Sequence, residues 1–129
     1  MSENKKYILL YIGRDNNFIQ FLNENSDKFT FYLKENPLLA NEFLNNNKDI
    51  AIDVIICETN LPGNNGIEVY KMLSKKLFYK KIPFILVNDK EFNPKTKEYA
   101  LKNGISDYFI KPLNANDLLI RIEYLILFK

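Results

Sequence analysis

The stretch Asp53-Val-Ile-Ile-Cys-Glu58-Thr-Asn-Leu-Pro-Gly-Asn-Asn-Gly66 decides the fold, because an unbroken apolar run ends there in a polar loop. An apolar run without polar alternation is typical of a strand that is buried on both faces of a parallel sheet, which predicts a strand over Val54–Cys57. Other apolar runs along the chain predict four further strands, at Tyr7–Ile12, Phe29–Leu33, Pro83–Val87 and Tyr108–Ile110.

Segments with helical spacing of apolar residues lie between these runs. Asn93 followed by Pro94 is a typical helix start, and Gly104 suits the position just past a helix end. The last helix is predicted from Ala115 to Phe128. Five strands that alternate with five helices predict a doubly wound α/β domain with right-handed crossovers.

The size and composition of the chain limit the classes of function. Its 129 residues show no internal repeat and no break in composition, and we expect a single domain over residues 1–129. The lone cysteine, Cys57, excludes an internal disulfide, and the absence of histidine removes histidine-based catalysis and most transition-metal sites. The net charge of +2 comes from acids and bases mixed along the chain, which argues against nucleic-acid binding.

Two features predict the location of the protein. No apolar run approaches the roughly 20 residues that cross a membrane. Residues 1–6 are polar and lack the apolar core of a secretion signal. We therefore expect a cytoplasmic protein without a membrane-bound segment.

Topology alone predicts where the functional residues lie. In an open parallel sheet the functional site lies beyond the carboxyl ends of the strands. The candidate residues therefore directly follow each strand, at 12–15, 58–60, 88–89 and 111–112.

Two motifs resemble signatures of the response-regulator receiver domains. The stretch quoted above is similar to the family's phosphoacceptor region, in which a strand ends in an acceptor aspartate and a loop with Pro-Gly-x-x-Gly follows. Gly104-Ile-Ser-Asp-Tyr-Phe-Ile-Lys111-Pro112 resembles the family's Gly-Ala-x-Asp-Tyr-x-x-Lys-Pro signature. The resemblance covers essentially the whole chain and implies a flavodoxin-like, five-stranded parallel sheet with strand order 2-1-3-4-5.

The resemblance also implies roles for individual positions. The acceptor aspartate of the family corresponds to Glu58, and the acidic pair that helps to hold Mg²⁺ corresponds to Ile12 and Gly13. The Ser/Thr that binds the phosphoryl group corresponds to Asn88, and Asn60 also lines the implied site. Four positions that support phosphorylation in the family are therefore occupied here by other residues, and only Glu58 keeps a carboxylate.

Other parts of the family pattern are retained. Lys111 stands where the family has its lysine, and Pro112 follows it where the family has a cis peptide. Tyr108 matches the aromatic residue that swings on activation.

The replacements predict a site that is not phosphorylated in the usual way. Mg²⁺ needs oxygen ligands in near-octahedral geometry, and neither Ile12 nor Gly13 offers a side-chain oxygen. Glu58 is one methylene longer than aspartate, which displaces the carboxylate from the geometry of attack. We expect no bound metal or other cofactor and no enzymatic activity. Instead, we expect Glu58 to pair with Lys111 and to accept a hydrogen bond from the Asn88 amide, which holds the site near one conformation.

Alternatives stay open at this point. The protein could accept phosphate on Glu58 or on a shifted acid such as Asp89, with Asp15 and Asp89 rebuilding a Mg²⁺ site. Asp15 also suits the start of the first helix, where a carboxylate is favoured by the helix dipole. A flavodoxin-like cofactor binder is a third class, but residues 12–17 contain only one glycine where a phosphate-binding loop is rich in them.

The last helix carries a second signal, because apolar residues lie on two of its faces. One face is predicted to pack on the sheet and contains Leu118, Leu119, Ile122, Leu125 and Ile126. The other face is predicted to form an interface and contains Ile120, Tyr124, Leu127 and Phe128. Receiver domains commonly associate through their fourth and fifth helices, so the resemblance implies a homodimer through the last two helices and protein partners in a bacterial signalling pathway.

Overall fold

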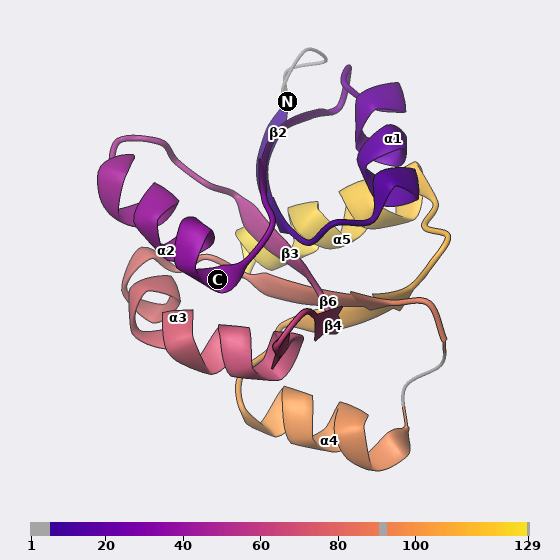
Figure 1. Cartoon of the computed structure of the whole chain (residues 1–129). Helices are drawn as coiled ribbons and strands as arrows, with labels where there is room; N and C mark the ends of the chain where they lie inside the picture. The colour runs from indigo at the N-terminus through magenta and orange to yellow at the C-terminus, as the bar shows by residue number, and fades with distance from the viewer. Residues whose placement is uncertain (1–5, 91–92, 129) are drawn as a thin grey trace.

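A five-stranded parallel sheet forms the centre of the fold, in a computed structural model that describes residues 6–90 and 93–128 (Figure 1). The spatial order is β2-β1-β3-β6-β7, which is the predicted order 2-1-3-4-5 of the five main strands. Residues 1–5 lie outside the described residues. The prediction that the polar residues 1–6 are not a secretion signal therefore falls mostly outside the described part of the chain. The strands of the sheet are β1 Tyr7–Ile12, β2 Phe29–Lys34, β3 Val54–Glu58, β6 Phe84–Asn88 and β7 Asp107–Ile110.

Within the described residues, five helices cover the two faces of the sheet, with α1 and α5 on one face and α2, α3 and α4 on the other (Figure 1). A hairpin of two-residue strands after β3 was not predicted; it consists of β4 Asn60–Leu61 and β5 Asn64–Asn65. The helices are α1 Asn16–Glu24, α2 Pro37–Asn46, α3 Gly66–Lys80, α4 Pro94–Lys102 and α5 Ala115–Leu127.

The predicted helix ends are confirmed where cap residues mark them. The Asn93 side chain accepts a hydrogen bond of 2.8 Å from the backbone N–H of Lys95 at the start of α4. Gly104 follows α4 with a φ of 100°, a conformation that glycine adopts without steric cost. Asp15 caps α1, because its Oδ1 accepts a hydrogen bond of 2.9 Å from the Asn17 N–H.

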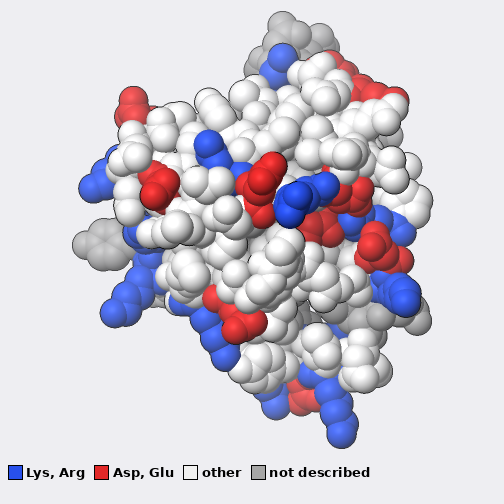
Figure 2. Space-filling view, viewed as in Figure 1, with Lys and Arg blue, Asp and Glu red and all other residues white. Residues whose placement is uncertain are grey.

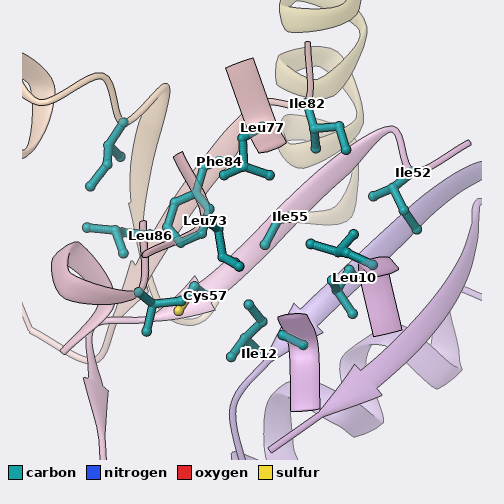
Figure 3. Close-up of a cluster of buried hydrophobic side chains, with 14 of the residues drawn as sticks. Leu10, Ile12, Ile52, Ile55, Cys57, Leu73, Leu77, Ile82, Phe84 and Leu86 are labelled. Carbon is teal, nitrogen blue, oxygen red and sulfur yellow. The ribbon is translucent and has the colours of Figure 1, made fainter. Parts of the chain in front are cut away.

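Two apolar cores lie on opposite faces of the sheet, because successive residues of a strand point to opposite sides. Ile55 and Cys57 of β3 belong to the core beneath α2 and α3, where Figure 3 shows their side chains beside those of β1 and β6. Val54 and Ile56 belong to the core beneath α1 and α5. Glu58 has the same parity as Val54 and Ile56, so its side chain leaves the strand on the α1/α5 side.

The two faces of α5 differ in burial. Leu118 and Ile122 are fully buried against the sheet. The side chains of the other face are exposed, namely Ile120, Tyr124, Leu127 and Phe128. Among the residues that the structure describes, no helix is both long and apolar enough to cross a membrane.

Candidate functional site

Five polar side chains meet at the carboxyl edge of the sheet and form the Lys111 cluster. Tyr11 lies in β1 and Asp15 caps α1, whereas Glu58 ends β3. Asp89 follows β6, and Lys111 follows β7. The elements come from most of the chain, and the parallel topology brings their ends to one edge.

Lys111 lies between three carboxylates. Its Nζ is 2.5 Å from Asp15 Oδ2, 2.7 Å from Glu58 Oε1 and 3.2 Å from Asp89 Oδ1. Burial lowers the pKa of Lys111, but hydrogen bonds to Asp15 and Glu58 outweigh this effect and raise the pKa to about 12. The hydrogen bond from Lys111 also lowers the pKa of Asp15. The peptide bond from Lys111 to Pro112 is cis, as predicted.

Glu58 is the most deeply buried charged residue of the cluster, with 8% of its surface exposed. Its Oε1 pairs with Lys111, and its Oε2 accepts a hydrogen bond of 2.6 Å from the Tyr11 hydroxyl. Burial and this hydrogen bond raise the pKa of Tyr11, so the phenol remains a donor at neutral pH. Both carboxylate oxygens of Glu58 therefore have a strong, charge-assisted partner.

Gly13 makes the room that this arrangement needs. A Cβ atom on Gly13 would lie 2.5 Å from Glu58 Cγ and 2.6 Å from the Tyr11 hydroxyl oxygen. Gly13 does not have a positive φ, so its backbone would accept another residue and only the lack of space excludes one. The glycine, the tyrosine and the longer acid are thus sterically matched to one another.

The remaining predicted residues lie around this cluster or away from it. The Ile12 side chain is fully buried in the core beneath α2 and α3, which corrects the expectation that Ile12 lines the site (Figure 3). Asn88 does not donate to Glu58 as expected, because its amide nitrogen donates to Lys90 O at 2.9 Å. Its amide oxygen accepts from the Thr59 hydroxyl at 2.8 Å.

Two other predicted residues lie near the edge but outside the cluster. Asn60 and Asn88 line a separate polar pocket of about 260 Å³ between the β3–α3 loop and α4. Tyr108 is half-buried against the core beneath α2 and α3, and the ammonium of Lys97 lies 4.7 Å from its ring centroid.

Comparison with known proteins identifies the family. The family model described as the response regulator receiver domain matches residues 17–123. This chain belongs to the response regulator receiver domain family. The receiver domain is therefore a signalling domain of the two-component type.

Individual relatives of this receiver domain come from plants and bacteria. A two-component response regulator of Arabidopsis thaliana (ARR7) is 26% identical over 82 residues, which are 64% of this chain and 39% of the regulator. A chemotaxis protein CheY homolog of Campylobacter jejuni is 30% identical over 89 residues, 69% of this chain and 66% of that protein. The chain thus spans well under two thirds of the plant regulator.

A solved structure agrees with the fold. The crystal structure of a response regulator receiver domain protein from Clostridium thermocellum superposes with a TM-score of 0.76 at 23% identity, covering 93% of this chain and 94% of that one.

The residues of the receiver domain do not fit the Mg²⁺ ion that the family pattern implies. Mg²⁺ is usually bound by one or two carboxylates, and water molecules occupy several of its remaining coordination positions. Here positions 12 and 13 supply no side-chain oxygen, and the Tyr11 ring and the Glu58 side chain fill the space beside Gly13. In the described part of the chain, no three His, Cys, Asp or Glu side chains are grouped to hold a metal ion.

Tyr11 is the residue of the cluster that sequence reasoning missed. It stands inside an apolar run, so it was assigned only to a buried strand. A signal was present in the parity of β1, because residues 11 and 13 share a face and Gly13 leaves a gap beside the tyrosine. A tyrosine two residues before a glycine at the end of a strand is the pattern that could have indicated a site role for Tyr11.

Proposed function

We propose that this receiver domain signals without phosphorylation and acts through protein–protein contacts. The observation that carries the proposal is the placement of Glu58 between the Tyr11 hydroxyl at 2.6 Å and the Lys111 ammonium at 2.7 Å. The site then holds an internal carboxylate where the family places a transferred phosphoryl group. Its charge of −1 is smaller than the charge of about −1.5 to −2 on a phosphoryl group, and it is permanent.

The chemistry of phosphoryl transfer supports the proposal. Transfer depends on a positioned nucleophile and on a metal ion that neutralises the charge on the phosphoryl oxygens. Both oxygens of Glu58 are engaged, and the ammonium of Lys111 is shared with Asp15 and Asp89. An attacking Glu58 would have to break its bonds to Tyr11 and Lys111 without a metal ion to replace them.

Treatment with a phosphoryl donor tests the proposal. The purified chain is incubated with acetyl phosphate, or with beryllofluoride, in the presence of Mg²⁺, and is then analysed by intact mass and fluorine NMR. We expect neither a mass increase nor a bound-fluoride resonance. Matched samples of Glu58→Gln and Asp89→Asn locate any adduct, and a stoichiometric adduct that disappears in Glu58→Gln would refute the proposal. Loss of the adduct in Asp89→Asn would instead support a phosphoaccepting regulator with a shifted acid.

We further propose that the exposed face of α5 forms a protein interface. Together with α4, this face would join two copies of the chain in a homodimer. Contiguous exposed apolar surface typically marks an interface. The rings of Tyr124 and Phe128 contact each other on this face with centroids 4.8 Å apart and a tilt of 42°, and Leu127 is the last residue of the helix. Replacing Tyr124 and Leu127 by glutamate is expected to abolish self-association in sedimentation velocity. A matched pair of glutamates at Gln20 and Asn23 on α1 should leave it unchanged, and equal sedimentation of both variants contradicts this interface.

The wider setting follows from the same proposal. We propose a cytoplasmic protein that contacts protein partners of a bacterial signalling pathway and has no catalytic role of its own. Affinity capture from source cells with the chain and with the Tyr124/Leu127 variant would identify partners that depend on α5.

A further inference from the structure

A groove opens at the amino edge of the sheet, opposite the Lys111 cluster. Its volume is about 680 Å³, and the ends of α3 and α5 flank the start of β6 around it. The floor is apolar and includes Leu77, Ile82, Pro83 and Leu125. Phe78 forms part of the wall with 86% of its surface exposed, which is unusual for a phenylalanine.

A second hollow of about 460 Å³ lies beside the first. The two hollows share Leu77 and Ile82 as lining residues, so they adjoin each other. Lys48, Lys76 and Lys80 line the second hollow, which lies between α2 and α3. We call the two hollows together the amino-edge groove.

The charged side chains that line the amino-edge groove are lysines, among the described residues. Residues 66–81 contain five lysines and one glutamate, whereas the whole chain has a net charge of only +2. Within the part of the chain that the structure describes, no acidic residue lines either hollow. Figure 2 shows lysine and arginine side chains on the lower left flank, over α3. Within the described residues, Lys48, Lys80 and Lys81 are exposed and form no ion pair, so their charges are available to a partner.

Lys81 occupies a backbone conformation that favours glycine. It ends α3 with φ 57° and ψ 45°, and it is the only residue other than glycine with a positive φ in the described ranges. A side chain in this left-handed conformation costs free energy that glycine would avoid. A lysine nevertheless stands at this position, where it lines the groove, and this favours a binding role for the Lys81 side chain.

We infer that the amino-edge groove binds an acidic segment of another protein, whose apolar side chains enter the two hollows while its carboxylates meet Lys48, Lys80 and Lys81. Apolar hollows of this size accept individual side chains, and large apolar anchors in such pockets carry most of the affinity of an interface. The ring of lysines adds specificity for an acidic partner and speeds association. A nucleic acid or an anionic membrane would meet the same lysines but would leave the apolar floor unfilled.

An unbiased peptide selection tests this inference on the whole chain. A library of random 12-residue peptides is displayed on phage and selected against the immobilised protein. We expect the enriched sequences to combine Asp or Glu with Leu, Phe or Trp. The best sequence is then synthesised with a fluorescent label, and its affinity is measured by anisotropy at low and high salt.

Matched charge reversals locate the binding site. Lys80→Glu with Lys81→Glu is expected to weaken the peptide at least tenfold, whereas Lys95→Glu with Lys102→Glu on α4 should change its affinity less than twofold. All four lysines are exposed, and thermal unfolding verifies that each variant is folded. Enrichment of peptides without acids, or equal binding to both variants, would overturn the inference. It is equally overturned if a DNA duplex or phosphatidylserine vesicles bind more tightly than the peptide with the same dependence on Lys80 and Lys81.

Lys81→Gly separates binding from folding. Glycine relieves the left-handed strain, so the unfolding temperature is expected to stay the same or rise, while the peptide affinity falls severalfold. A lower unfolding temperature with unchanged affinity would show that the Lys81 side chain serves the fold and not the groove.

Discussion

Replacing Lys111 with methionine removes the only cation that the structure places between Glu58, Asp15 and Asp89 among the described residues. The side chains of Lys111 and Glu58 are each 11% exposed, so their pair is largely shielded from water. Breaking a buried pair from one side typically costs about 3–5 kcal/mol, because the remaining charge stays buried. The Asp89 side chain is 79% exposed, and its contact contributes at most about 1 kcal/mol. We therefore expect a loss of about 3–5 kcal/mol in the free energy of unfolding, mostly through Glu58.

The pH dependence gives this variant a distinctive signature. In the native protein the pKa of Asp15 is lowered, so stability is lost as the pH falls below about 4. The hydrogen bond from Lys111 is the largest cause of this lowered pKa, so the loss of stability at low pH should be smaller in Lys111→Met than in the native protein.

Urea unfolding between about pH 2 and pH 8 measures both the loss of stability at pH 7 and its pH dependence. Glu58→Gln in the native and in the Lys111→Met background completes a double-mutant cycle. We expect a coupling energy of at least about 2 kcal/mol at pH 7. A coupling below about 0.5 kcal/mol would refute the assignment of Glu58 and Lys111 as a buried pair, and parallel pH profiles for the native protein and Lys111→Met would contradict the effect of Lys111 on the pKa of Asp15.

The other predictions concern the neighbours of Glu58. Gly13→Ala places a Cβ atom 2.5 Å from Glu58 Cγ and should cost about 1–3 kcal/mol in urea unfolding, with partial recovery in Gly13→Ala/Glu58→Ala. Full stability of the single variant would show that the space beside Glu58 is not tightly filled. Tyr11→Phe removes a hydrogen bond to a charged group and should cost about 1.5–3 kcal/mol at pH 7, a loss that would be absent if the hydroxyl were not engaged. Because the pKa of Tyr11 is raised in the folded state, its contribution is present below pH 10 and lost as the pH rises. The native protein should therefore lose stability above pH 10 more steeply than Tyr11→Phe, by about 1.4 kcal/mol per pH unit, and identical alkaline profiles would contradict this.

Most of the fold was predictable from the sequence because apolar runs and cap residues act locally. The predicted strand Tyr7–Ile12 has the same bounds as β1. The last helix was predicted to end at Phe128, and α5 ends one residue earlier, at Leu127. The hairpin of β4 and β5 was missed, because strands of two residues have no periodicity to recognise.

The candidate site was predictable only where a residue follows its strand directly. Glu58 and Lys111 were paired from topology and resemblance, and they lie 2.7 Å apart. The partner of the second Glu58 oxygen depends on the register of β1 against β3, which aligns Tyr11 with Ile56 and lets the tyrosine side chain reach Glu58, two residues further along β3. Strand register and the contacts of a long side chain depend on the folded structure, so a local sequence pattern does not predict them.

The departures from the family pattern fit together, which is an argument against simple loss of function. Removal of the acidic side chains alone would leave a cavity beside the strand end and a buried lysine without its partners. Instead, Gly13 leaves a space that the Tyr11 hydroxyl and the extra methylene of Glu58 fill, and Lys111 meets three carboxylates. The lack of a side chain at position 13 is required by this arrangement, since a Cβ atom there would collide with both Tyr11 and Glu58. The matched packing supports a site that is built to keep one arrangement, with its charge balance supplied by the protein's own side chains.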